Sequence, residues 1–289
     1  MLKHHLLTLL ATTLVAGSFI VSQTLAPLIH PLSLTLLRFL GASLILLPIV
    51  LSQKKWRRTI LTTLPKAMII SLFYAIFFVA HFASLQLTSA LHTAALFTLV
   101  PFLTAILSIM IWKETLNLQK LSAYALGIIG SCLILFSNNI EDFLAFHINE
   151  GDALFMIAVL SMSLYGIARK FFYQDESMIV LVFGTLLGGA VWIFIALLFT
   201  NQALDWQLLE KEAWLQMAYL IIAATLMTVY IYQKSTVALG ASRVSAYIYL
   251  TPALIVLIRF ITDGVEFSLP ILLGIIFSSL ATILLQKNP

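Results

Sequence analysis

Residues 31–51 read PLSLTLLRFLGASLILLPIVL, and Arg38 is the one charged residue among them. A helix needs about 20 mostly apolar residues to cross a hydrocarbon core of roughly 30 Å, so this stretch is long enough to span a membrane. Similar stretches flank it throughout the chain, and none shows the alternating pattern of a barrel strand. Only helices then satisfy all their backbone groups in lipid. The sequence therefore predicts an all-α membrane protein with ten transmembrane helices, at residues 6–27, 31–51, 66–87, 92–111, 119–137, 152–168, 178–199, 213–233, 244–262 and 269–285.

The overall composition agrees with this interpretation. Of 289 residues, 61% are apolar and 10% are charged, and the mean hydropathy is +1.05. Soluble domains are closer to about 45–50% apolar and about 25% charged, which excludes a water-soluble enzyme. The 12 acidic and 16 basic residues are too few and too scattered for a nucleic-acid surface. A single cysteine, Cys132, permits no internal disulfide and no cysteine metal cluster.

The positions of the basic residues predict the orientation. If the N-terminus lies in the cytoplasm, 13 of the 16 lysines and arginines fall at cytoplasmic helix ends. They are Lys3, Lys54, Lys55, Arg57, Arg58, Lys66, Lys113, Lys120, Arg169, Lys170, Lys234, Arg243 and Lys287. Because cytoplasmic loops carry an excess of basic residues, both termini are expected in the cytoplasm.

The ten predicted helices divide into two groups of five. The polar stretch 138–151 separates residues 1–137 from residues 152–289, and it is expected to be an external linker. An odd number of helices in each group means that the second group enters the membrane upside down. Inverted repeats of this kind are typical of secondary transporters, whose binding sites lie near the midplane between the repeats.

Two prolines lie at equivalent positions of these groups, 151 residues apart. Pro101 and Pro252 each follow a tight turn of small residues, and we expect both in mid-helix. There a proline removes one hydrogen bond and bends the chain, which would free the carbonyls of Phe97 and Ile248. The alternative is that both are ordinary prolines, which transmembrane helices tolerate.

At this point the chain resembles the drug/metabolite transporter superfamily, in particular its EamA-type family. The residues that carry the resemblance are Pro31 and Arg38-Phe39 in the second predicted helix, the Pro101 helix ending in Lys113-Glu114, and its counterpart from Pro252 to Glu266. The chain departs from the family in having Gly17 without the usual preceding Trp, and Gly264-Val265-Glu266 in place of a Gly-Glu pair. The resemblance implies an inner-membrane carrier of small metabolites, with amino acids and related compounds first, and a central cavity that opens alternately to each side.

Arg38 is the clearest candidate for substrate binding. A charge inside the membrane costs about 2.5–3.5 kcal/mol on insertion scales, so such residues are functional candidates by default. Arg38 lies roughly 10 Å below the outer membrane surface, at 1.5 Å per residue. Its guanidinium is suited to a bidentate pair with a substrate carboxylate. The alternative, which we favour slightly, is that it braces the fold by bonding helix carbonyls.

His81 and His92 flank the turn between the third and fourth predicted helices. Either imidazole is able to accept a proton near neutral pH or to donate to a substrate, and His81 is the better candidate because it lies deeper. The ordinary alternative is a buried histidine that bonds a nearby carbonyl. Two histidines without an adjacent acid make a poor metal site, so we expect neither a metal nor a cofactor.

Tyrosines are concentrated in the second half. Tyr165, Tyr230 and Tyr247 are the candidates for an aromatic-lined binding pocket. A belt of tyrosines at the membrane interface is the alternative for some of these positions.

The expected mechanism is alternating opening of two helical hairpins, residues 66–111 and 213–262. Pro101 and Pro252 would shape their bends, and His92 and Arg243 would lie at opposite mouths. Apart from Asp152, the first residue of one predicted helix, none of the 12 acids falls inside a predicted helix, so we expect uniport or exchange first and histidine-dependent proton coupling second.

Two rival functions are weighed against a carrier. An intramembrane enzyme or sensor would need a catalytic pair in the bilayer, and the predicted helices contain no acid other than Asp152. A channel would need charged rings or filter-like loops, which the sequence lacks. The expected partners are therefore a small-molecule metabolite and the lipid bilayer, with no nucleic acid, and a homodimer remains an open alternative.

Overall fold

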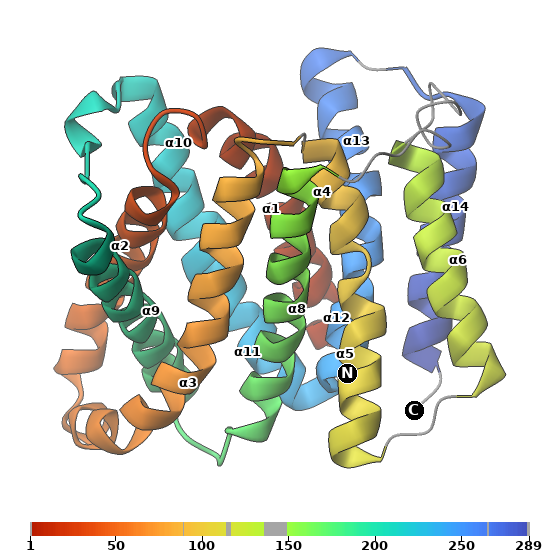
Figure 1. Ribbon diagram of the computed structural model, residues 1–289. Coiled ribbons are helices and arrows are strands. Elements are labelled where there is room, and N and C mark those ends of the chain that lie inside the picture. The colour runs from red at the N-terminus through yellow and green to blue at the C-terminus, as the bar shows by residue number, and fades with distance from the viewer. Residues whose placement is uncertain (1, 89, 114–116, 136–148, 265, 288–289) are drawn as a thin grey trace.

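Figure 1 shows the computed structural model, which is a bundle of helices. The structure describes residues 2–88, 90–113, 117–135, 149–264 and 266–287, and these ranges contain helices and no strand. Most of the predicted linker 138–151 lies outside the described residues, as do Glu114 and Val265. The helical part of the predicted fold class is therefore confirmed.

The helices follow one another with short connections. In chain order they are α1 (Leu2–Leu25), α2 (Pro31–Ser52), α3 (Lys54–Ser84), α4 (Ala90–Phe97), α5 (Val100–Trp112), α6 (Leu118–Leu135), α8 (Glu150–Phe171), α9 (Met178–Thr200), the 3₁₀-helix η1 (Trp206–Leu208), α10 (Lys211–Ile221), the π-helix η2 (Ile222–Met227), α11 (Thr228–Leu239), α12 (Ala241–Ala246), the 3₁₀-helix η3 (Tyr247–Leu250), α13 (Thr251–Asp263) and α14 (Leu269–Lys287).

Eight helical segments of the described chain are long and apolar enough to cross a membrane. Two shorter apolar helices, Val100–Trp112 and Leu118–Ile134, accompany them, and every predicted stretch overlaps one of these ten segments. The clearest difference is in α3, which begins at Lys54, well before the predicted start at residue 66. We predicted that the basic segment before residue 66 is a connection, but it is part of α3. A helix that leaves the hydrocarbon core can continue into the polar region of the membrane.

The chain runs up and down the bundle. Helix α1 begins and α14 ends at the lower end in Figure 1, where the α2–α3 and α8–α9 connections also lie. Side chains also join α3 to the α8–α9 connection, because Lys66 Nζ in α3 bonds both Gln174 Oε1 (2.7 Å) and the carboxylate of Glu176. Burial raises the pKa of the Glu176 carboxyl, but the hydrogen bonds from Lys66 and from backbone N–H groups, together with the Lys66 charge, hold the net pKa below its ordinary value.

The two halves repeat the same pattern of helix boundaries. Helices α4, α5 and α6 each begin 151 residues before α12, α13 and α14, respectively. The residue after α5, Lys113 (φ 54°), and the residue after α13, Gly264 (φ 68°), both adopt the left-handed conformation that ends many helices. The weak sequence repeat at an offset of 151 therefore corresponds to a structural repeat.

The prolines lie at the breaks between these helices and not in mid-helix. Helix α4 ends at Phe97 before α5 begins, and Pro101 is in the first turn of α5. Pro252 is likewise in the first turn of α13, after η3. The prediction of mid-helix prolines was wrong in this detail. A proline in the first turn of a helix costs no hydrogen bond, because the N–H at that position has no intrahelical partner in any case.

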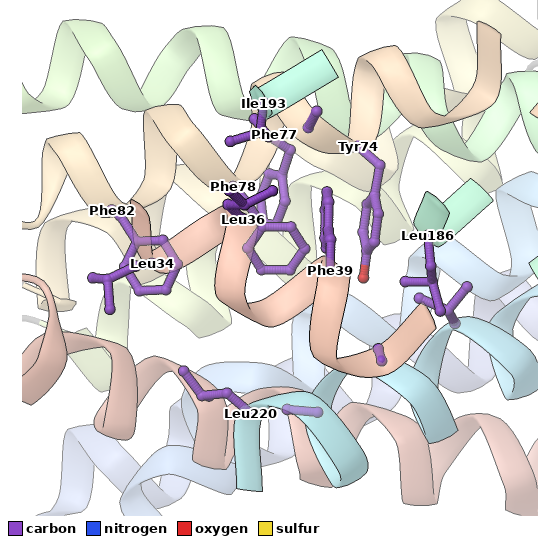
Figure 2. Close-up of a cluster of buried hydrophobic side chains, with 14 of the residues drawn as sticks. Leu34, Leu36, Phe39, Tyr74, Phe77, Phe78, Phe82, Leu186, Ile193 and Leu220 are labelled. Carbon is purple, nitrogen blue, oxygen red and sulfur yellow. The ribbon is translucent and has the colours of Figure 1, made fainter. Parts of the chain in front are cut away.

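Aromatic rings fill the contact between α2 and α3. Figure 2 shows the rings of Phe39 and Tyr74 lying face to face, with Phe78 beside them. The Phe39 and Tyr74 centroids are 5.3 Å apart and the planes differ by 11°. Gly189 of α9 allows this packing, because a Cβ there would lie 2.5 Å from the Phe39 ring.

Two glycines let α6 and α14 approach closely. A Cβ on Gly274 would lie 2.5 Å from the carbonyl oxygen of Gly130, and a Cβ on Gly130 would lie 2.7 Å from the backbone nitrogen of Ser278. Close backbone approach of this kind drives helix association in membranes, where lipid leaves no hydrophobic gain between helices. This contact joins the last helix of the first half to the last helix of the second.

We predict that Gly274→Val destabilises the protein, because the new side chain meets backbone that cannot move aside. Overpacking of this kind costs about 1–3 kcal/mol. The control is Gly166→Ala in α8, where an added Cβ meets nothing within 4 Å. Melting of both variants in the same detergent checks this, and an unchanged melting temperature for Gly274→Val would contradict the close contact.

Candidate functional site

Two adjacent hollows lie inside the bundle and share the side chains of Val15, Phe97, Met162 and Tyr232. We call them together the central cavity. The upper hollow is lined by Val15, Ser18, Phe19, Arg38, Tyr74, Phe77, Phe78, His81, Phe97, Met162, Tyr165, Ala224, Thr228, Val229 and Tyr232. The lower hollow is lined by Val15, Phe97, Val100, Thr104, Met162, Gly166, Arg169, Tyr232, Ala241, Val244, Ser245 and Ile248.

The central cavity is nearly closed in this structure. Each hollow has a volume of about 30 Å³. On this measure one water molecule needs about 10–15 Å³, so each hollow has room for only a few waters. Helices α1 to α5 from the first half and α8, η2, α11, α12 and η3 from the second half form its walls.

Arg38 enters the central cavity from α2 and is held by the second half of the chain. Its side chain is 1% exposed. Nη2 donates to the carbonyl of Ala224 (3.1 Å) and Nε donates to Oγ1 of Thr225. The guanidinium carbon also lies 4.1 Å from the centre of the Phe78 ring. These contacts favour the interpretation of Arg38 as a brace, while its Nη1 has no hydrogen-bond partner among the described residues.

The acceptors for Arg38 come from the π-helix η2. A π-helix is a rare local widening of a helix, and such segments occur frequently at functional sites. The carbonyl of Ala224 accepts from Arg38 and also from the hydroxyl of Thr228 (2.8 Å). The π-helix therefore provides hydrogen-bond acceptors for a buried cation within a transmembrane helix.

A ladder of aromatic rings connects Arg38 to a second buried arginine, Arg169. The Phe78 ring packs edge-on against Tyr74 (4.8 Å between centroids), and Tyr74 stacks on Tyr165 (4.3 Å, 18°). The Arg169 guanidinium carbon then lies 4.6 Å from the centre of the Tyr165 ring. The ladder crosses the bundle from α2 and α3 to α8, so the two cations belong to one site.

Arg169 is a site residue that the sequence analysis missed. We counted it as a charge at a cytoplasmic helix end, but its side chain is 4% exposed and lines the lower hollow. The Tyr232 ring lies 5.9 Å from its guanidinium carbon, on α11. The available signal was Tyr165, four residues earlier and therefore on the same helix face.

His81 lies at the upper end of the central cavity within a group of phenylalanines. It is 2% exposed and stacks on Phe77 (5.8 Å, 6°), with Phe19 and Phe155 edge-on at 4.9 and 5.7 Å. Its Nδ1 has no partner among the described residues. The structure therefore brings His81, Arg38 and Tyr165 into one cavity.

Two predicted tyrosines lie elsewhere. Tyr230 lines a separate apolar groove between α2, α9 and η2, because it is two residues from Tyr232 and points to another side of the helix. Tyr247 donates or accepts a hydrogen bond with His5 Nδ1 (2.8 Å) at the start of α1, and it lines neither hollow.

The predicted gating residues are distributed over both hairpins. Pro101 and Pro252 are buried at the helix breaks, and Arg243 lies in α12 close to the start of α1. His92 lies in α4, but its side chain is outside the described part of the structure.

Polar contacts join helices of the two halves near both ends of the bundle. At the upper end in Figure 1, Thr88 donates to Oδ1 of Asp152 (2.9 Å) and accepts from Asn149 (3.1 Å), which joins the α3–α4 turn to α8. At the lower end the hydroxyls of Ser108 and Ser242 are 3.0 Å apart, which joins α5 to α12. Asp152 is fully buried at the start of α8, where it closes a capping box with Asn149.

We predict that Thr225→Val destabilises the protein, because it removes an acceptor for Arg38 and leaves a buried charged donor unpaired. Hydrogen bonds to charged groups contribute about 1.5–3 kcal/mol. The matched control is Thr185→Val in α9, whose hydroxyl bonds the Leu181 carbonyl of its own helix. Thermal unfolding of both variants checks this, and equal losses would argue against a special role for the Arg38 contact.

Comparison with known proteins gives three results. The description of the EamA-like transporter family matches residues 2–136 and 149–286. The chain is 26% identical over 188 residues to a Bacillus subtilis (strain 168) protein named "Uncharacterized transporter YyaM", which covers 65% of this chain. The matched region spans 60% of that relative's length.

One solved structure has the same fold. It is titled "Crystal structure of protein", and it superposes with a TM-score of 0.72 over 98% of this chain and 96% of that one, at 16% identity. The family match covers both halves of the chain, and the apolar helices agree with it. The chain is therefore a multi-pass membrane protein that belongs to the EamA-like transporter family.

Proposed function

We propose that the protein carries small organic metabolites, amino acids or related compounds, across the inner membrane by alternating access. In this proposal ten spans form two inverted five-helix repeats, residues 1–137 and 152–289, with both termini in the cytoplasm. The basic residues near the lower end of the bundle support this orientation. Substrate contacts are proposed for Arg38, His81 and Tyr165.

The nearly closed central cavity carries this proposal. Buried polar atoms that have no partner among the described residues, including Arg38 Nη1 and His81 Nδ1, line a space enclosed by apolar and aromatic side chains. Ligand sites have this composition, with a few polar groups fixing a ligand that apolar walls enclose. Such groups are costly inside a membrane and are retained where a transported compound needs them.

The contacts at the two ends are suited to alternate opening. Breaking the Thr88–Asp152 contact would open the cavity upward, and breaking the Ser108–Ser242 contact would open it downward. The helix breaks before Pro101 and Pro252 lie on these hairpins and supply points at which they bend. With both contacts formed, the structure represents an occluded state.

Uniport or exchange is the proposed mode of transport. The residues that line the central cavity include two arginines and one histidine, and no carboxylate. A cation-coupled carrier usually holds its ion with oxygen ligands, which this lining offers only as hydroxyls and carbonyls. Proton coupling through His81 is the second choice.

A binding and flux screen tests the proposed function. We expect at least one compound from a panel of amino acids, nucleosides and quaternary ammonium compounds to raise the melting temperature, because a ligand at 100 times its Kd stabilises by about 2.7 kcal/mol. The same compound should then enter proteoliposomes faster than empty liposomes. Absence of both binding and flux across the panel would contradict a carrier function.

A reversible crosslink tests alternating access. In a Cys132→Ser background we predict that oxidation of Ser108→Cys/Ser242→Cys stops transport of the best compound from the screen, and that a reductant restores it. The crosslinked protein should still bind this compound, because the upper end remains able to open. Oxidised single-cysteine variants are the controls, and full transport by the crosslinked pair would refute the gate.

A further inference from the structure

Arg169 is a buried cation with unused hydrogen-bond donors. Its Nε and Nη1 have no acceptor in the described part of the chain, although the side chain is 4% exposed. Arg38 differs, because two of its three nitrogens bond protein acceptors in η2. The two arginines of the ladder are therefore not equivalent, because Arg169 has two nitrogens without an acceptor among the described residues and Arg38 has only Nη1.

The charge of Arg169 is also not compensated by an acid. Among the described residues the one salt bridge is that between Lys66 and Glu176. No aspartate or glutamate lines either hollow. A buried charge is normally paired or hydrogen-bonded, so an anion is the partner that this guanidinium lacks.

The surroundings of Arg169 define the shape of that anion. The Tyr165 and Tyr232 rings pack against the guanidinium at 4.6 and 5.9 Å, which leaves its N–H edges for an acceptor in the plane. Thr104 Oγ1 lines the same hollow and is likewise without a partner among the described residues. A carboxylate has two coplanar oxygens and matches such an edge.

Apart from Ser245, the remaining side chains that line the lower hollow are apolar. Val15, Phe97 and Met162 border both hollows, so they lie between the Arg169 end and the Arg38 end. An inorganic anion would lose its hydration against these side chains without compensation. A compound with a carboxylate and an apolar or aromatic body would bury that body here and gain from doing so.

We propose that Arg169 binds the carboxylate of the transported compound, and that the substrate class is small organic carboxylates with an apolar body. This inference rests on the proposed transport function and makes it specific. It moves the carboxylate contact from Arg38, which braces α2 against η2, to Arg169 at the other end of the aromatic ladder. Tyr165 and Tyr232 then enclose both the guanidinium and the bound ligand.

Matched pairs of acids and amides test this proposal on the full-length purified protein. The probes are phenylacetate compared with phenylacetamide, and L-phenylalanine compared with L-phenylalaninamide. Chloride and phosphate are tested as inorganic anions for comparison. We expect the carboxylates to bind at least about 10-fold more tightly than their amides, because a hydrogen bond to a charged group is lost in the amide. Uptake into proteoliposomes should show the same preference.

Variants of Arg169 separate binding from support of the fold. Arg169→Gln should weaken carboxylate binding about 10- to 100-fold and leave the ligand-free melting temperature unchanged or higher, because an unpaired buried charge is removed. Arg169→Lys should retain part of the affinity, since it keeps the charge and loses the planar fork. Arg259→Gln is the control, because that arginine is exposed on α13.

The outcomes distinguish this proposal from the transport function itself. Equal binding of acids and amides, or a lower ligand-free melting temperature for Arg169→Gln, would overturn the role of Arg169. Protection by chloride or phosphate as strong as that by the carboxylates would overturn the organic substrate class. Transport of a nucleoside or a quaternary ammonium compound without any carboxylate preference would leave the carrier function intact and refute this inference alone.

Discussion

The hydrogen bonds between Arg38 and η2 are the interaction on which the rest of the structure depends. A guanidinium inside the bundle requires hydrogen-bond acceptors, because a buried charge without them is costly. The π-helix at Ile222–Met227 provides them through the Ala224 carbonyl, which also accepts from Thr228, and through the Thr225 hydroxyl. Because Arg38 belongs to the first half and η2 to the second, this contact fixes the two halves around the space that becomes the central cavity.

Much of the fold was predictable from the sequence because the bilayer leaves few choices. Each apolar stretch of sufficient length must be a helix, and the offset of 151 residues reappeared in the boundaries of α4–α6 and α12–α14. The details that failed depend on tertiary contacts. The burial of Arg169 and Asp152 requires neighbours from other helices, and a count of charges at helix ends cannot see them.

The site was predictable only in part, for the same physical reason. Hydropathy places Arg38 and His81 in the membrane, and both line the central cavity. It cannot say which face of a helix a tyrosine occupies, so Tyr230 and Tyr247 were chosen with the same weight as Tyr165. Tyr230 lies outside the central cavity because it faces another side of its helix. Tyr247 lies outside it because it is hydrogen-bonded to His5 near the N-terminus. The π-helix has no sequence signal that composition or periodicity reveals.

The internal repeat places equivalent positions of the two halves in the site, and sequence differences between the halves make its two ends chemically different. His81 and Tyr232 are 151 residues apart, and both line the central cavity, one among phenylalanines and the other beside Arg169. Likewise Tyr74 belongs to the aromatic ladder, whereas its counterpart Thr225 accepts from Arg38. Two halves with identical residues would present the same groups to both ends of a ligand. Here the guanidinium with two unpartnered nitrogens lies at one end only, so the proposed carboxylate ligand would be held in one orientation.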